Sequence, residues 1–479
     1  MLHYHSLSRS GGSGRRAGLR IQSRKGWGFE SLLLHHKRSD IVEYQECDLV
    51  CLIDGQSSHK CLARVVVKKQ LVQALYKQAL DRHRFYVQAR GFARGKTPVS
   101  YLERTCRSNL IEHMKEFLLN HCVINTLCQE LYQQHTVIAG DPQLTSIAIT
   151  PESDAEFNFS CSRLPLTLKT HWRDLSLKAP ARRNYKDLDR QVELFIQEET
   201  ARGKGVDKKN GISMSDWVLF SVSLIDHEMR TPLSSYKDKL WMKIGKEEID
   251  RDAQLSFLNK KEQDLFITDS TLLQNYFSKQ LDTDYLFALE ILAIVPHATS
   301  TLEHFKHHFG LSSNLEVRRM LIEIFSHRHD ISLRRETVEA TLKQLVKQIT
   351  SPIPSELIRQ QEALLLREIQ RSSDYPVYRL QKDFRSKIST LAAKQLHETL
   401  IIDHIAHEEG ISVSQDDVNA YIALLQRPRT KEFIYFDLPI AQMNGQEQPL
   451  PAGIIQQACL REKTLNKLIK MLSRKGSSR

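Results

Sequence analysis

The spacing of hydrophobic residues changes near residue 298, and this change limits the chain to folds with a separate helical part. Before it, short apolar runs such as Val218 to Ile225 and Tyr285 to Val295 are typical of strands. After it, apolar residues recur three or four positions apart, which is the period of an amphipathic helix. Two such series are Val377, Leu380, Phe384, Ile388 and Leu391, and Leu465, Leu468, Ile469 and Leu472. The pattern predicts a small β-rich domain over residues 211–297 and a helical domain over residues 298–479.

The first third of the chain mixes both patterns. Two strand-like runs, Leu49 to Ile53 and Cys61 to Val67, are separated by the turn-like residues 54–58, so we expect a β-hairpin. Helical spacing follows from Val72 to Leu80 and again from Leu110 to Leu127. Strands followed by helices in this order indicate an α+β domain.

A linker over residues 163–210 separates this α+β domain, residues 41–162, from the middle domain. The linker holds a helical stretch from Leu188 to Glu199 and ends in a segment rich in Gly and Lys, Gly203 to Gly211. With 479 residues the chain is too long for one compact core. The expected fold class is therefore α+β multidomain: an α+β domain, a small β-rich domain and an all-α carboxyl-terminal domain.

Residues 1–40 are rich in Arg and Ser and hold only two acids, Glu30 and Asp40, so no core is expected there. Such a start is also typical of a transit peptide or an RNA-binding arm. The stretch from Gly28 to His36 resembles the translation of a transfer-RNA gene. We expect a disordered or spurious amino-terminal extension, with the true start near residue 41.

The formal net charge of +11 favours an anionic partner, because each phosphate neutralised by Lys or Arg releases counterions. RNA or a ribosome fits this charge, and so does a surface that is basic only for solubility. No apolar run of ~18 residues predicts a membrane span, and the first residues lack the apolar core of a secretory signal. We expect a cytoplasmic protein with no membrane partner.

Cofactor chemistry has no clear signal in the sequence. Neither a Walker-type phosphate-binding loop nor a glycine-rich dinucleotide fingerprint occurs, and the 8 cysteines follow no paired CxxC spacing. Several histidines lie close together without a carboxylate or cysteine at a characteristic offset, so solvated helix faces are expected. These are His304, His307 and His308, His327 and His329, and His404 and His407. We expect no cofactor and no metal.

Adjacent carboxylates also suggest no acid/base pair. Glu247 with Glu248 and Glu408 with Glu409 are consecutive residues, which point apart on a helix, so we interpret them as surface groups. Asp416 follows Ser414 and is interpreted as part of a helix start. No catalytic residue is expected from these pairs.

The loop from Gly91 to Pro98 is the most informative stretch. Its sequence is Gly91, Phe92, Ala93, Arg94, Gly95, Lys96, Thr97 and Pro98. Glycine permits turn geometry, proline fixes the exit, and cations flank an aromatic ring. Between residues 81 and 110 seven cations oppose only Asp81 and Glu103, which predicts a positive field at the loop. A solvated turn between two helices fits the same residues.

This loop resembles the ribosome-docking signature of trigger factors, Gly-Phe-Arg-Lys-Gly-Lys-Val-Pro. Gly91, Phe92, Gly95, Lys96 and Pro98 are identical and Arg94 is a conservative replacement. Ala93 stands where the family has Arg, and Thr97 where it has Val. The resemblance implies ribosome-binding residues Gly91, Phe92, Arg94, Gly95, Lys96 and Pro98, with docking weakened or altered by the cation missing at Ala93.

The resemblance extends along the chain from about residue 41. Residues 163–199 are similar to the family's linker, Phe287 to Gly310 to the exit from its isomerase domain, and Ile353 to Ile358 to the start of a substrate-cradling arm. It implies a ribosome-binding domain, a middle domain of the FK506-binding type and a helical chaperone domain, in that order.

The function implied is an ATP-independent chaperone that docks at the ribosome exit and shields nascent chains during folding and export. The implied partners are an exit-tunnel protein, ribosomal RNA, and nascent and unfolded polypeptides, with a possible homodimer when free. The family also implies roles in protein transport and cell division.

The middle domain lacks the pocket motifs of a peptidyl-prolyl cis-trans isomerase. If Asp216 is set against the family's leading acid, Ser221, Val222 and Leu224 replace the Asp, the aromatic residue and the Gly of the pocket strand. Trp217, Trp241, Phe257, Phe266 and Phe277 are interpreted as core residues rather than a rebuilt pocket. Isomerase activity is therefore expected to be weak or absent. Two alternatives stay open: an active isomerase, and a basic ribosome- or RNA-binding factor without holding activity.

Overall fold

The computed structural model describes most of the chain from residue 48 onward. The described residues are 48–54, 60–86, 89–133, 138, 142–162, 166–178, 180, 187–203, 211–225, 237–278, 285–297, 302–328, 331–350, 352–370, 375–431, 433–438, 442–443 and 445–477. The expectation for residues 1–40 lies outside them, as do residues 55–58 of the expected turn and residues 204–210 of the linker.

An antiparallel sheet in the order β1-β2-β4-β3 forms the amino-terminal unit. Its strands are β1 (Leu49–Asp54), β2 (Lys60–Val67), β3 (Gln143–Ala148) and β4 (Ala155–Ser162). β1 pairs with β2 from Leu49 opposite Val67 to Asp54 opposite Leu62, which confirms the predicted hairpin. Alternate residues of β4, such as Phe157 and Phe159, are buried, so one face of the sheet is the core face.

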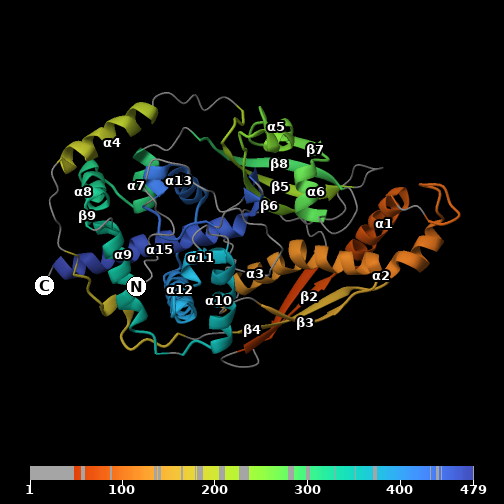
Figure 1. Cartoon of the computed structure of the whole chain (residues 1–479), viewed down its shortest axis with the longest axis horizontal. Coiled ribbons are helices and arrows are strands. Elements are labelled where there is room, and N and C mark those ends of the chain that lie inside the picture. The colour runs from red at the N-terminus through yellow and green to blue at the C-terminus, as the bar shows by residue number, and fades with distance from the viewer. Residues whose placement is uncertain are drawn as a thin grey trace.

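Helices cover that core face. They are α1 (Lys69–Tyr86), α2 (Val99–Leu118), the π-helical turn η1 (Leu119–Val123) and α3 (Ile124–Gln133). α2, η1 and α3 follow one another without a break, so the π turn is an insertion within one long helix. Figure 1 shows α1 and α2 side by side, with the loop between them at the end of the molecule opposite the carboxyl-terminal helices.

The segment after β4 ties the amino-terminal unit to the helical region. Leu168 forms a β-bridge with Ile349, and Trp172, in the 3-10 turn η2 (Trp172–Asp174), is fully buried. Glu408 accepts hydrogen bonds from His171 and Trp172, and Glu409 accepts them from Arg173. Glu408 is exposed, as expected, whereas the Glu409 side chain is only 10% exposed, so the surface role expected for Glu409 is wrong. Both carboxylates anchor the linker. α4 (Leu188–Gly203) follows and confirms the predicted linker helix.

A second antiparallel sheet, in the order β13-β6-β5-β8-β7, forms the middle of the molecule. Its strands are β5 (Trp217–Ile225), β6 (Asp238–Lys243), β7 (Leu265–Thr268), β8 (Leu286–Val295) and β13 (Leu450–Pro451). The 3-10 turn η3 (Glu248–Asp250), α5 (Arg251–Phe257) and α6 (Thr271–Ser278) accompany it. β13 pairs with β6 although it lies more than 150 residues after the predicted boundary at residue 297.

The helical region contains most of the remaining chain. Its helices are α7 (Leu302–Phe309), α8 (Asn314–Phe325), α9 (Leu333–Val346), α10 (Ser355–Gln370), α11 (Tyr375–Tyr378), α12 (Phe384–Glu408), α13 (Gln415–Leu425), α14 (Pro428–Lys431) and α15 (Ala452–Ser477). Short strand pairs are β9 (His327–Arg328) with β10 (Ile331–Ser332) and β11 (Gln442–Met443) with β12 (Gln446–Glu447). Together with the two sheets this confirms the α+β multidomain fold class.

One predicted amphipathic series is a continuous helix and the other is not. Leu465, Leu468 and Leu472 are buried on α15 against α9 and α12, and Figure 1 shows α15 running through the helical region. Val377 and Leu380 instead are 65% and 81% exposed, because α11 ends at Tyr378 and α12 begins only at Phe384. A continuous helix through residues 377–391 was therefore a wrong expectation.

Buried ion pairs fix the helices to each other. Arg461 on α15 donates two hydrogen bonds to Asp403 on α12, and both side chains are almost fully buried. Arg427 pairs with Glu199 of α4 in the same way. Breaking a buried pair by removing one partner leaves a charge without compensation, at a cost of about 3–5 kcal/mol. α13 begins at a capping box of Ser414 and Asp417, which confirms a helix start there.

Candidate functional site

The loop between α1 and α2 is a pair of tight turns that only glycine closes without strain. The amide of Phe92 donates to the carbonyl of Ala89, and the amide of Lys96 donates to that of Ala93. Gly91 and Gly95 have φ of 90° and 79°, which is the left-handed region that residues with a Cβ avoid. A Cβ on Gly91 would meet no atom within 4 Å, so the requirement there is conformational rather than steric.

The aromatic ring of the loop is supported by α2 rather than fully presented to solvent. Phe92 is half-buried, and its ring centroid lies 5.3 Å from that of Tyr101. Arg94 donates from Nε to the backbone carbonyl of Phe85 at 3.1 Å, which joins the loop to the end of α1. Phe85, at the end of α1 beside the loop, is 60% exposed.

The cations around the loop carry no internal counter-charge. Arg90, Arg94, Lys96 and Arg104 are exposed, and none of them forms an ion pair with a carboxylate among the residues that the structure describes. Arg107, further along α2, is paired with Glu152 at 2.6 Å. Unpaired charge is therefore concentrated at the tip, and we call the exposed side chains of Phe85, Arg90, Arg94, Lys96 and Arg104 the tip surface.

The structure brings five of the six predicted docking residues together in one turn pair, and Pro98 precedes the first residue of α2. The sequence motif did not single out Phe85 or Arg104 as part of the tip surface, or Tyr101 as the ring that contacts Phe92 and Arg104. A usable signal was present: Tyr101 and Arg104 are three residues apart in the first turns of a helix that follows Pro98, so they share a face next to the loop.

Thr97 has its side chain inside the unit, in contrast to its neighbours. It is fully buried, and its hydroxyl finds no hydrogen-bond partner in the described part of the chain. The family's Val at this place has the same shape without the hydroxyl. The difference at Thr97 is therefore internal and does not alter the tip surface.

The middle sheet was the other candidate, and its aromatic residues do not converge on one pocket. Phe220, Phe257 and Phe277 pack on one face, whereas Trp241 packs on the opposite face against Tyr421 of α13. Ser221, at the place of the family's acid, is opposite Glu290 on β8 and not on the face of Phe220. The sheet therefore shows no dry aromatic slot of the kind that isomerisation needs.

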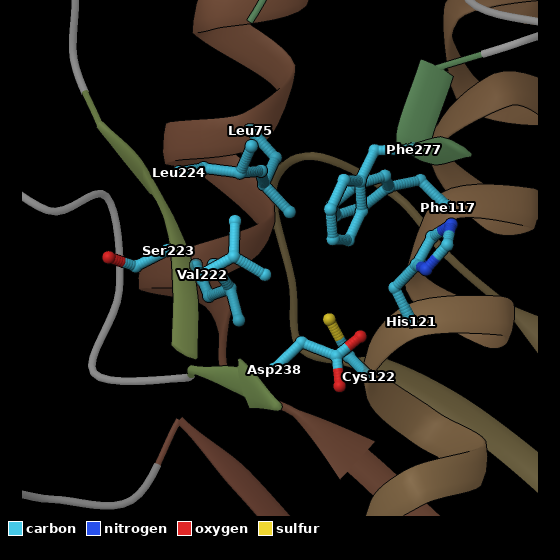
Figure 2. Close-up of a pocket in the computed structure, with 10 residues that line it drawn as sticks. Leu75, Phe117, His121, Cys122, Val222, Ser223, Leu224, Asp238 and Phe277 are labelled. Carbon is cyan, nitrogen blue, oxygen red and sulfur yellow. The ribbon is translucent and has the colours of Figure 1, made fainter. Parts of the chain in front are cut away.

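Helices of the amino-terminal unit cover the aromatic face. Figure 2 shows Phe117, His121 and Cys122 facing Phe277 and Asp238 across a small cavity, which has a volume of about 30 Å³. His121 and Cys122 belong to the π-helical turn. The cavity has room for a water molecule but not for a prolyl peptide.

Asp238 is the one carboxylate that lines this cavity. Its carboxyl is buried, and desolvation raises its pKa to about 7. Oδ1 accepts hydrogen bonds from the amide of Lys239 at 2.9 Å and from Asn125 at 3.4 Å. The carboxyl links the two units. Burial raises the pKa of the Cys122 thiol beside it, and the cavity leaves no space for a prolyl peptide.

The grouped histidines are tied to carboxylates and rings of the fold. Nε2 of His307 lies 2.9 Å from Oδ1 of Asp417, and His308 is buried beside Tyr421 and Glu462. His307 is exposed, as expected, whereas His308 is buried, so the solvated face expected for His308 is wrong. Burial lowers the pKa of His308 to about 3. Within the described ranges no cluster of three or more His, Cys, Asp or Glu side chains is arranged to hold a metal ion. None of the described helices is long and apolar enough to cross a membrane.

Two family models match the chain in order. The model described as "Bacterial trigger factor protein (TF)" matches residues 53–195, and the one described as "Bacterial trigger factor protein (TF) C-terminus" matches residues 316–470. Neither of these two covers residues 196–315, which hold four strands of the middle sheet.

Curated relatives cover most of the chain at low identity. The trigger factor of Desulfatibacillum aliphaticivorans is 19% identical over 416 residues, which is 83% of this chain and 93% of that protein. The trigger factor of Rickettsia canadensis is 20% identical over 341 residues, covering 70% and 75%.

A solved structure, described as "Promiscuous Substrate Recognition in Folding and Assembly Activities of the Trigger Factor Chaperone", aligns with 88% of this chain at 14% identity. The alignment covers 100% of that chain, with a TM-score of 0.36. The two family models and the relatives show that this chain belongs to the trigger factor family.

Proposed function

We propose that this chain is an ATP-independent chaperone that docks on the ribosome through the tip surface and shields nascent polypeptide. Its place in the trigger factor family supports a folding chaperone. The observation that carries the docking step is the concentration of unpaired cations and aromatic rings on a tight loop at one end of the molecule. Ribosomal RNA and acidic protein side chains are the partners that such a surface attracts.

Shielding requires apolar surface that the fold leaves uncovered. The predicted stripe on α15 is buried, so it does not serve. Val377 and Leu380 are exposed between α10 and α12, and Leu255 and Leu265 are 77% and 73% exposed in the middle unit. An unfolded segment gains about 25 cal/mol for each Å² of apolar surface that it buries there. Several weak contacts of this kind permit release without nucleotide.

Ribosome pelleting tests the docking step. Alanine at Phe92, Arg94 and Lys96 removes one ring and two cations from the loop, and we expect ribosome association to be lost with the fold intact. The matched control replaces Arg64, Lys68 and Arg107, three cations of the same unit that are paired with Glu156, Asp154 and Glu152. Equal pelleting of the loop variant and the wild type would mean that docking lies elsewhere.

A further inference from the structure

The cations of α2 fall into two kinds. Arg107 and Lys115 each lie 2.6 Å from a carboxylate, Glu152 and Glu112. Arg104 has no carboxylate partner in the described part of the chain, and its guanidinium carbon instead lies 6.0 Å from the ring centroid of Tyr101. A guanidinium held over an aromatic ring keeps the N–H groups at its edge available. Arg104 is thus held in place while its charge stays uncompensated.

The ring that holds Arg104 also supports the docking loop. Tyr101 packs against Phe92 with ring centroids 5.3 Å apart and ring planes tilted by 56°, so Phe92, Tyr101 and Arg104 form one row of contacts from the loop to α2. Arg94 is less available than Arg104, because its Nε is used by the carbonyl of Phe85. A cation on α2 therefore stands next to the loop that carries Ala93.

We propose that Arg104 supplies the cation that Ala93 lacks and binds a phosphate of ribosomal RNA beside the loop. This role rests on the proposed docking of the chain on the ribosome. A guanidinium offers parallel N–H donors that match two phosphate oxygens. The exposed ring of Phe85 beside the same loop adds an apolar face of the kind on which nucleotide bases stack. Cations next to an aromatic face favour RNA over a protein carboxylate as the partner of Arg104.

The test compares Arg104→Ala with Arg107→Ala, which removes a paired cation from the same helix. Ribosome affinity is measured for both variants and the wild type over a series of salt concentrations. Losing one phosphate contact should weaken binding about tenfold at low salt. It should also make the slope of log affinity against log salt shallower by about 0.7–0.9. Arg107→Ala should leave both quantities unchanged.

A relocation variant separates charge from shape. Ala93→Arg combined with Arg104→Ala returns one cation to the loop, and we expect it to restore the affinity and the salt slope of the wild type. Circular dichroism of each variant confirms that the fold is kept. Failure of this rescue would show that Arg104 acts through something other than its charge.

The remaining outcomes distinguish this role from the docking proposal. If the triple loop variant loses binding while Arg104→Ala binds as the wild type does, Arg104 has no such role and docking stands. A loss of affinity with an unchanged salt slope would make the partner a protein carboxylate and would overturn the RNA assignment. If the wild type does not bind ribosomes, both proposals fail.

Discussion

Single residues explain why the loop departs from its family signature without losing its shape. Ala93 is exposed, so the missing Arg removes charge and no packing. Thr97 is buried, so its hydroxyl adds a cost inside the unit and changes nothing outside. We therefore expect the two substitutions to act on different properties, Ala93 on the proposed docking and Thr97 on stability.

Thr97→Val should stabilise the chain. The replacement keeps the shape and removes a buried hydroxyl that has no partner among the described residues, which corresponds to about 1 kcal/mol. The thermal unfolding midpoint measures the gain, and ribosome affinity should stay constant. An unchanged or lower midpoint would show that the hydroxyl is satisfied in solution.

Asp238→Asn should remove a loss of folding stability at high pH that arises where the amino-terminal and middle units meet. Burial raises the folded pKa of Asp238 from 3.8 to about 7. The folded state therefore favours the protonated carboxyl. The contribution of this group to the free energy of unfolding falls as pH rises from about 4 through 7. Asn does not ionise and keeps the Oδ1 acceptor. We expect the variant to gain about 2–4 kcal/mol over the wild type above pH 8 and little at pH 4.

Unfolding of both proteins at pH 4 to 8.5 measures this difference. The quantity to compare is the difference between the variant and the wild type at each pH, because other buried carboxyls such as Glu462 titrate in both proteins. A difference that does not grow with pH would contradict the buried, neutral state of Asp238.

At the scale of elements, the middle sheet explains the expected loss of isomerase activity. Its aromatic face is covered by α2 and the π-helical turn, and the cavity left there is about 30 Å³. Isomerisation of an X-Pro bond has a barrier of ~18–20 kcal/mol, and lowering it requires a pocket that fits the twisted amide. We predict that a proline-containing test peptide isomerises at nearly its uncatalysed rate. A clear acceleration, blocked by a ligand of the proline pocket, would overturn this.

The break between α11 and α12 predicts where clients are held. Val377 and Leu380 are exposed there because the helix is interrupted between Tyr378 and Phe384. Replacing both with Ser should weaken the suppression of client aggregation, measured by light scattering without nucleotide. The matched control is Leu52→Ser with Leu62→Ser, two exposed apolar residues on the amino-terminal sheet. Equal protection by both double variants would place the holding surface elsewhere.

At the scale of the whole molecule, local patterns were predictable from the sequence and distant contacts were not. Strand-like apolar runs located the first hairpin, and apolar residues at helical spacing located α4 and α15. These elements were predictable because they depend on neighbours in sequence. The pairing of β13 with β6 joins segments about 200 residues apart and has no local signal. The contact between Phe117 on α2 and Phe277 beside the middle sheet also joins residues far apart in the sequence.

The loop from Gly91 to Pro98 was predictable only in part. Its glycines and Pro98 have a local cause, so the turn pair was predictable. The row of contacts from Phe92 through Tyr101 to Arg104 depends on how α2 leaves the loop, which the motif alone does not specify. The family signature therefore identified the loop but not the full tip surface.

The two regions that we propose for docking and for shielding lie apart in the molecule. The tip surface lies at one end, and Figure 1 shows the helical region with α10 and α12 at a distance from it. A chain docked through the tip keeps its exposed apolar residues free to meet a polypeptide that leaves the ribosome. Docking and shielding should therefore fail separately when their own residues are changed.

Crosslinking of a nascent chain on stalled ribosomes tests this account most directly, because it requires docking and shielding together. A crosslinker in the nascent chain should capture the wild-type protein and the paired-cation control of Arg64, Lys68 and Arg107. Capture should be lost in the variant with alanine at Phe92, Arg94 and Lys96. Equal capture of that variant and the wild type would contradict the claim that the tip surface brings this chaperone to its clients.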